Sequence, residues 1–311
     1  MRDTLVGAGL TEIVTSALVS PRHLETFVLR REVPSVGGEP QPGGVPITVT
    51  NPLSRDHSLL RRNLIGSILD VVGVNLRHGT DDVAVFEIGK GYARQGDAAC
   101  EWWRAGFALV GAAEAPAWNR SRRPYDLDDA KGVVELLARR LHLSRPTWTP
   151  EPDEPLFHPG RTARVTAGDR LQGIVGEFRP ALVRAWELRT TDRVLVGELS
   201  LEGLAEGTLR PERAPTVSRF PDTERDLAIV VPETIPAAAV EATVTAAAGP
   251  LLRAISLFDI YRGVPLGVDE KSLAFRLAFA APDRTLTEDE VEGVVAGIVM
   301  GLGAIGGRLR A

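Results

Sequence analysis

One glycine-rich stretch near the C-terminus has the residue types of a phosphate-binding loop. The run GLGAIGGR contains Gly301, Gly303 and Gly306 and ends in Arg308. A dinucleotide site needs such glycines between a strand and the start of a helix, where backbone N–H groups meet the phosphates. Here the glycines follow an apolar helical stripe and lead into a strand-like run. Because this order is reversed, the stretch is interpreted as a tight turn.

The remaining reactive side chains do not form a catalytic or metal-binding pattern. His158, in FHPGRTARV, is a conceivable general base, but no nucleophile or orienting partner lies near it in the sequence. A structural histidine is the better interpretation. Cys100 is the single cysteine and lacks an activating neighbour, and the five histidines are scattered without the spacing of metal ligands.

Two groups of acids lie at predicted helix starts. Asp126, Asp128 and Asp129 precede one apolar helical pattern, and the acidic triplet 288–290 precedes another. Carboxylates at such positions accept hydrogen bonds from exposed N–H groups and interact favourably with the helix dipole. Helix capping explains both groups, so we expect no catalytic and no metal-binding residue in this chain.

Composition limits the classes of function. The formal net charge of the 311 residues is -5, which argues against a generally basic nucleic-acid coat and confines any RNA contact to a local patch. No apolar run approaches the roughly 20 residues that span a bilayer. The N-terminal stretch also lacks the core of a signal peptide. These features predict a cytoplasmic protein without a membrane role.

The chain divides into two regions at a stretch rich in Gly, Pro and charge, residues 202–218. In the first region, apolar residues at helical spacing predict two helices, marked by Leu60, Leu64, Ile68 and Val72 and by Val133, Leu137 and Leu141. Strand-like runs are DVAVFEIGKGY, RAGFALVG, RTARVTAG, RLQGIVGEF and DRVLVGELSL, with a short helix over 180–186. This region is predicted to be a sheet-rich α+β domain.

The second region has a clearer pattern. Strands are predicted around 227–231, 251–261, 272–280 and 304–310, and Val240 and Val244 mark a helix between the first two. Thr287 and Glu290 have the spacing of a capping box before a long apolar stripe, which predicts a second helix. The resulting order, βαββαβ, is that of a ferredoxin-like fold.

Four blocks of the second region resemble, in order and spacing, the ferredoxin-fold anticodon-binding domain of phenylalanyl-tRNA synthetase. They are SRFPDTERDLAIVV at 218–231, SLFDIYRG at 256–263, EKSLAFRLAF at 270–279 and DRTLTEDEV at 283–291. Upstream, NPLSRDHSLLRRNLIGSILDVVGVNLRHG, VAVFEIGKGY, YDLDDAKGVVELL and FHPGRTARV resemble the catalytic-like module of the same β subunit. The resemblance implies a class II synthetase-like, non-catalytic module over 1–208 and an anticodon-binding domain over 216–311.

The β subunits of this family are considerably longer, with oligonucleotide-fold and editing modules that are not found here. Either a truncated reading frame or a split subunit is expected. The resemblance further implies that this chain carries no chemistry. Where the family's module would place motif 2, Glu87 replaces the arginine that holds the ATP phosphate. No cofactor is expected on this chain, whereas the complete ligase would use phenylalanine, ATP and Mg²⁺ on its catalytic α subunit.

The resemblance implies contacts with the anticodon region of tRNA-Phe. If Leu273, Phe275, Leu277 and Phe279 face the helices, alternation places Arg276 on the open face, which makes it the leading candidate. Further candidates in or beside the matched blocks are Arg219, Arg225, Arg262, Lys271 and Arg284 for phosphates and Phe220 and Tyr261 for base stacking. For each of the two aromatic residues taken singly, a core position is favoured.

Charge restricts the kind of RNA contact. From Thr216 to the end the chain contains 9 Lys and Arg and 13 Asp and Glu, a net charge of -4. Binding by bulk charge requires the opposite sign. We therefore expect a small, oriented contact and a weak RNA affinity for this chain alone.

The stretch RDTLVGAGLTEIVTSALV resembles the motif 1 element through which class II modules pair. This implies a docking surface for the catalytic α subunit within an α2β2 assembly, with candidate contacts Leu5, Leu10, Ile13 and Val14. Core packing is an equal alternative for these four residues. Two other functions are open: a free-standing RNA-binding or regulatory paralogue, and a monomeric synthetase with its own active site. The missing motif 2 arginine and motif 3 argue against the latter.

Overall fold

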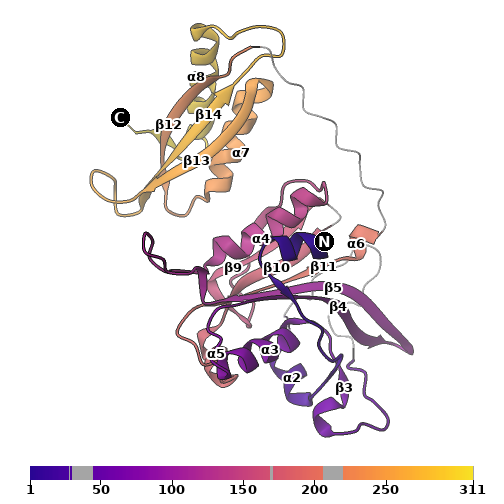
Figure 1. Cartoon of the computed structure of the whole chain (residues 1–311). Helices are drawn as coiled ribbons and strands as arrows, with labels where there is room; N and C mark the ends of the chain where they lie inside the picture. Colours follow the sequence, from indigo (N-terminus) through magenta and orange to yellow (C-terminus); the bar gives the residue numbers. More distant parts are fainter. Residues whose placement is uncertain (28, 30–44, 169–170, 206–219, 311) are drawn as a thin grey trace. The chain divides into compact units, whose positions relative to one another are not determined.

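The chain forms two compact units, Met1–Glu212 and Arg213–Ala311. The structure is a computed structural model and describes residues 1–27, 29, 45–168, 171–205 and 220–310 (Figure 1). The first unit has two apolar cores on a large sheet, and the second unit has one core on a smaller sheet.

A seven-stranded sheet is the centre of the first unit. In spatial order its strands are β1 (Thr11–Glu12), β4 (Val83–Gln95), β5 (Ala98–Val110), β11 (Val194–Ser200), β10 (Leu171–Phe178), β9 (Phe157–Ala167) and β8 (Thr147–Pro150). Strands β1 and β4 pair in parallel, and the other pairs of this sheet are antiparallel. The strand-like runs of the first region are therefore confirmed as strands of one sheet.

Helices cover both faces of this sheet (Figure 1). On one side are α2 (Pro21–Thr26), α3 (Ile65–Arg77) and α5 (Pro180–Ala185), and on the other are α1 (Arg2–Gly7) and α4 (Leu127–Arg140). Each layer encloses a separate apolar core. The sequence predicted Leu60 on the same helix face as Leu64, Ile68 and Val72, and for Leu60 this was wrong. Leu60 belongs to β3 (Leu59–Leu60), which pairs with β2 (Leu18–Val19). Its spacing matched that helix face by coincidence.

Short elements complete the first unit. They are η1 (Arg55–His57), the hairpin strands β6 (Ala112–Glu114) and β7 (Arg123–Pro124), and α6 (Glu202–Ala205). Helix α6 falls at the start of the stretch that the sequence indicated as a linker.

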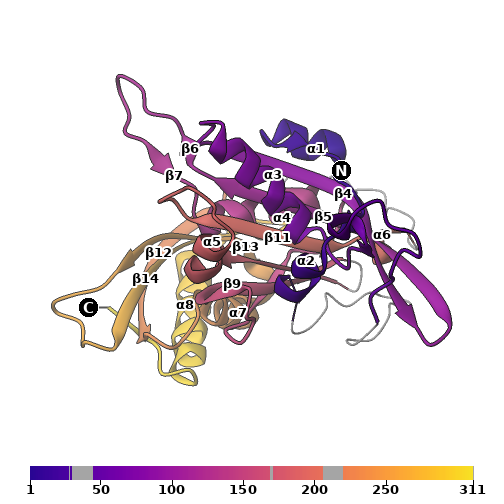
Figure 2. The ribbon, with the colours of Figure 1, turned by 90° about the horizontal axis from the view of Figure 1, so that it is seen from below.

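The second unit has the predicted βαββαβ order. Its sheet has the order β13 (Leu252–Tyr261), β14 (Glu270–Phe279), β12 (Thr223–Pro232) and β15 (Arg308–Leu309), and its helices are α7 (Ala237–Ala248), η2 (Gly249–Leu251) and α8 (Glu288–Gly303). Helices α7 and α8 lie on the same face of the sheet (Figure 2). Among the residues of this unit that the structure describes, no helix lies on the other face.

Local chemistry sets the ends of α8. Thr287 and Glu290 form the expected capping box, in which each side chain accepts a hydrogen bond from the other residue's backbone N–H. The helix ends at Gly303, and Gly306 has a φ of +73°, a conformation that glycine adopts without steric cost. The glycines of GLGAIGGR therefore form the helix end and a turn, as predicted.

Candidate nucleic-acid interface

Strand β14 sorts its side chains between the two faces of the second sheet. Leu273, Phe275, Leu277 and Phe279 are buried in the core beneath the helices. Arg276 lies between them in sequence and is exposed. The predicted alternation is confirmed, and Arg276 lies on the open face of the sheet.

Arg276 is part of a three-residue contact on this face. It donates two hydrogen bonds of 2.9 Å to Asp226 of β12, and its guanidinium carbon lies 5.3 Å from the ring centroid of Phe258. The hydrogen bonds with Asp226 raise the pKa of Arg276 above its usual value, and those with Arg276 lower the pKa of Asp226. Both groups are therefore charged at neutral pH, and the cation already has an anion beside it.

A second aromatic and arginine pair lies on the same face. The guanidinium carbon of Arg310 is 4.6 Å from the ring centroid of Tyr261, whose hydroxyl donates a 2.6 Å hydrogen bond to the carbonyl of Val264. The preference for a core position was wrong for Tyr261, which is 36% exposed. The β13–β14 register shifts between Leu257 and Asp259, and this bulge moves the following residues of β13 to the opposite face.

Small side chains separate these two pairs. By strand register, the row between those of Arg276 and Tyr261 holds Ala228, Ala274 and the short acid Asp259, so no long side chain rises from the middle of the sheet. Arg308 of β15 donates hydrogen bonds of 2.6 and 3.0 Å to Glu270. The result is a shallow platform with an arginine-backed aromatic ring at two points, which is suited to stacking of unpaired bases.

Three predicted RNA contacts lie elsewhere. Arg225 lies on the side of β12 that faces the core and the helices, and it pairs with Glu288 at the start of α8. Arg262 donates to Glu233 at 2.7 and 3.1 Å, and Arg284 donates to Glu290 at 2.6 Å. Each arginine is held by a carboxylate away from the platform. Their role as phosphate contacts remains a prediction.

Lys271 is placed unfavourably for RNA binding. It is 8% exposed, and its Nζ donates a 2.8 Å hydrogen bond to the carbonyl of Glu233. This buried ammonium cannot reach a phosphate without losing that bond. Phe220 is partly buried, and Arg219 lies outside the described residues.

Sequence reasoning missed three residues of the platform, namely Phe258, Arg308 and Arg310. Phe258 lies inside the matched block SLFDIYRG, but its orientation depends on the bulge in β13. Arg308 and Arg310 alternate along the last strand, and Arg308 pairs with Val230 of β12. That alternation was available in the sequence as a signal.

The first unit buries its central acids against its own chain. Glu87 is 3% exposed and accepts hydrogen bonds from Arg61 Nη2 at 2.8 Å and from Thr15 Oγ1 at 2.6 Å. Glu198 of β11 accepts from the backbone N–H of Leu64 at 2.7 Å and lies 3.7 Å from Arg104. Glu87, which was expected in place of a phosphate-binding arginine, is therefore hydrogen-bonded within the first unit itself.

Glycines let the segment 61–64 lie directly on the sheet. A Cβ at Gly91 would be 2.2 Å from the carbonyl oxygen of Arg62, and one at Gly89 would be 2.5 Å from Nη2 of Arg61. At Gly106 it would be 2.6 Å from the Ile68 side chain. This part of the sheet is therefore covered by the chain itself.

The candidate docking residues near the N-terminus divide into two groups. Leu5 and Leu10 are 2% and 4% exposed and pack in the core beside α4, so their assignment to a partner surface was wrong for the folded unit. Ile13 is partly buried against the other core. Val14 is 90% exposed, and Val6, which the sequence did not single out, is 55% exposed.

Val14 lies at the edge of a cleft of about 820 Å³ between α2, α3 and η1. In it, the 5% exposed imidazole of His23 lies 3.3 Å from Asp70, which also accepts a 3.0 Å hydrogen bond from Trp186 Nε1. Among the residues that the structure describes, no partner is found for the buried hydroxyl of Ser67 on the cleft wall. The cleft has a mixed polar and apolar lining, and Val14 is one of its apolar residues.

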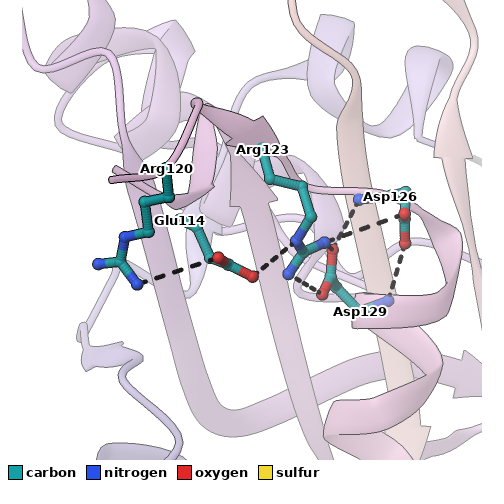
Figure 3. Close-up of polar contacts among 5 residues, drawn as sticks. All are labelled: Glu114, Arg120, Arg123, Asp126 and Asp129. Carbon is teal, nitrogen blue, oxygen red and sulfur yellow. Dashed lines mark hydrogen bonds and ion pairs between the residues drawn. The ribbon is translucent and has the colours of Figure 1, made fainter. Parts of the chain in front are cut away.

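The acids at the start of α4 are structural (Figure 3). Asp126 and Asp129 form a capping box, and Arg123 donates to Asp129 at 2.8 and 3.0 Å and to Glu114 at 3.0 Å. Burial alone would raise the pKa of Asp129, but the hydrogen bonds from Arg123 and from the Asp126 backbone lower it overall. The predicted capping role is confirmed. His158 Nδ1 accepts a 3.1 Å hydrogen bond from the N–H of Gly160, and both residues lie in β9.

Comparisons with known proteins agree with both units. A family model described as the phenylalanyl tRNA synthetase beta chain CLM domain matches residues 1–201, and one described as the ferredoxin-fold anticodon binding domain matches residues 218–310. Together, the two modules in this order define a component of an aminoacyl-tRNA synthetase. The chain belongs to the phenylalanyl-tRNA synthetase β chain family.

Curated relatives named phenylalanine–tRNA ligase beta subunit include the proteins of Moorella thermoacetica (36% identical over 290 residues), Symbiobacterium thermophilum (35% over 311) and Bacillus subtilis (29% over 293). The matches cover 93%, 99% and 94% of this chain but 35%, 34% and 35% of the respective relatives. The chain thus spans about a third of the length of these relatives. Among the described helices, none is long and apolar enough to cross a membrane.

Proposed function

We propose that this chain acts as a non-catalytic β-subunit portion of a cytoplasmic phenylalanine–tRNA ligase. In this role the second unit binds the anticodon region of tRNA-Phe, and the first unit docks the catalytic α subunit within an α2β2 assembly. The observation that carries the proposal is the pair of family matches, which follow one another along nearly the whole chain.

The open platform of the second unit supports the RNA-binding part. Phe258 and Tyr261 are 54% and 36% exposed, and each has an arginine over its ring. Stacking of bases on aromatic rings contributes about 1–3 kcal/mol per base. Arg276 would contact a phosphate after exchanging its carboxylate partner, Asp226. The affinity of the isolated chain is therefore low, and its salt dependence is shallow.

The covered sheet of the first unit supports the absence of chemistry. Arg61 is paired with Glu87, and the segment 61–64 lies on the strands that carry Gly89, Gly91 and Gly106. In the proposed complex, phenylalanine activation with ATP and Mg²⁺ takes place entirely on the α subunit. The exposed Val6 and Val14 provide apolar contacts toward that subunit.

The test of the RNA-binding part is fluorescence anisotropy with a labelled tRNA-Phe anticodon stem-loop. The chain should bind it more tightly than a stem-loop with a permuted anticodon. Phe258→Ala should weaken binding roughly tenfold, since one stacking contact contributes about 1–3 kcal/mol. Met300→Ala removes an apolar side chain that is 81% exposed on α8, on the helical face, and serves as the control.

The rival proposal is a free-standing RNA-binding or regulatory paralogue. Equal binding of both stem-loops, together with no association with the α subunit, would favour that alternative. Loss of binding in Met300→Ala as large as that in Phe258→Ala would show that RNA does not use the open face.

A further inference from the structure

The hairpin of β6 and β7 places a fully exposed tryptophan at its tip. Ala117 and Arg120 form a bridge with backbone hydrogen bonds of 3.0 and 3.2 Å, which leaves Trp118 and Asn119 as a two-residue turn. The Trp118 side chain is 97% exposed. Turns favour Gly, Asn, Asp and Pro for conformational reasons, and no such reason applies to tryptophan. The fold of the first unit therefore does not require this side chain.

The base of the hairpin is fixed to three other parts of the first unit. Arg122 donates to Asp192, before β11, at 2.6 and 3.1 Å and lies 3.6 Å from Asp82, before β4. Arg123 is bonded to Asp129 of α4 and to Glu114 of β6 (Figure 3). Two arginines with bidentate partners hold the strands in one orientation. The tip is thus presented on a rigid support that projects from the sheet (Figure 2).

The charges around the hairpin are unsuited to RNA. Three arginines, at 120, 122 and 123, contact five carboxylates, those of Asp82, Glu114, Asp126, Asp129 and Asp192. The five negative charges exceed the three positive charges by two. A nucleic-acid phosphate approaching Trp118 would meet this excess, and Arg122 and Arg123 are already engaged. Arg120 is the most loosely held of the three, 4.0 Å from Glu114.

We propose that the β6–β7 hairpin is a docking anchor that inserts Trp118 into an apolar pocket of a protein partner. The pocket would be flanked by a carboxylate that pairs with Arg120. Within the proposed function, on which this inference rests, the partner is the catalytic α subunit. An exposed tryptophan beside an arginine, on a hairpin braced at its base, has the composition of the residues that dominate the binding energy of protein interfaces.

The test measures the dissociation constant of the complex with the α subunit from the same source. Trp118→Ala should weaken the complex about thirtyfold or more, the loss that a central tryptophan gives, while Trp118→Phe should recover part of it. Leu53→Ala is the matched control, since Leu53 is 103% exposed in the same unit. The melting temperature and the stem-loop affinity should stay unchanged in all three variants.

The outcomes separate the two proposals. A wild-type chain that forms no complex overturns α-subunit docking, and the hairpin inference with it. A wild-type complex that Trp118→Ala leaves equally tight overturns the hairpin inference alone. A loss of stem-loop affinity in Trp118→Ala, without any change in the protein complex, would show that the tip contacts RNA.

Discussion

Arg276 and Asp226 join β14 to β12 through two hydrogen bonds of 2.9 Å on the open face of the second sheet. The cation proposed to meet RNA is therefore neutralised in the free protein. Binding a phosphate requires it to exchange one anion for another, which limits the gain. This relationship explains how a unit with a net negative charge can still have an RNA site, and why that site is expected to be weak.

Removing the competing anion should strengthen RNA binding. In Asp226→Asn, Arg276 loses its ionic partner, and the open face loses one negative charge. We expect the affinity for the tRNA-Phe stem-loop to rise about threefold to tenfold, roughly 0.6–1.4 kcal/mol. The control is Glu288→Gln, which makes the same charge change beside Arg225 at the start of α8. An equal rise in both variants would mean that net charge, and not Arg276, controls binding.

The segment that covers the first sheet depends on glycine. Gly91→Ala should destabilise the first unit, because the new Cβ would lie 2.2 Å from the Arg62 carbonyl. We expect a fall in the free energy of unfolding of about 1–3 kcal/mol. Gly132→Ala in α4 has no atom within 4 Å of the new Cβ and should stabilise by about 0.5–1 kcal/mol. Denaturant unfolding measures both variants, and a neutral Gly91→Ala would contradict the described close approach.

Helix capping makes a separate prediction for the second unit. Thr287→Ala removes the side-chain oxygen that accepts from the Glu290 N–H and should cost about 1 kcal/mol. For a domain of this size that is roughly 5 °C in Tm. Thr245→Ala is the control, because its hydroxyl donates within α7 to the carbonyl of Glu241 and caps no helix start. Calorimetry of the full chain should resolve a lower transition in Thr287→Ala alone.

Glu270 should give the second unit a pH-dependent contribution to stability. Hydrogen bonds from Arg308 and from the Gly267 N–H lower its pKa from 4.5 to about 2. A lowered pKa means that the contribution is complete above about pH 4.5 and is lost as the pH falls toward 2. Glu270→Gln should therefore lower Tm at pH 7 and lower it much less at pH 2. Glu292→Gln on α8 is the control, and a Tm difference in Glu270→Gln that persists unchanged at pH 2 would contradict this assignment.

The sequence predicted local patterns well but not the contacts that depend on strand register. Alternation along β14 placed Arg276 correctly, yet its pairing with Asp226 follows from the alignment of two strands that are 50 residues apart in sequence. Lys271 lies two residues before Leu273 and therefore on the same face of β14, so its burial could be predicted from the alternation. The exposure of Tyr261 could not be predicted, because a bulge between Leu257 and Asp259 moves the later residues of β13 to the opposite face.

The candidate docking residues near the N-terminus show a second limit of prediction from the sequence. Apolar residues at the start of a chain have the same composition whether they fill a core or face a partner. Leu5 and Leu10 are buried by α4, an element more than 100 residues away, and Val14 is not. Only the tertiary arrangement separates these cases. Trp118 was likewise overlooked, since its significance lies in a 97% exposed side chain on a braced hairpin.

The central claim is tested most directly by co-expressing this chain with the catalytic α subunit and measuring the native mass of the purified material. The account predicts a stable complex that contains both chains, in the mass ratio of an α2β2 assembly. It is contradicted if the two folded proteins separate during purification and each has the mass of its own free form.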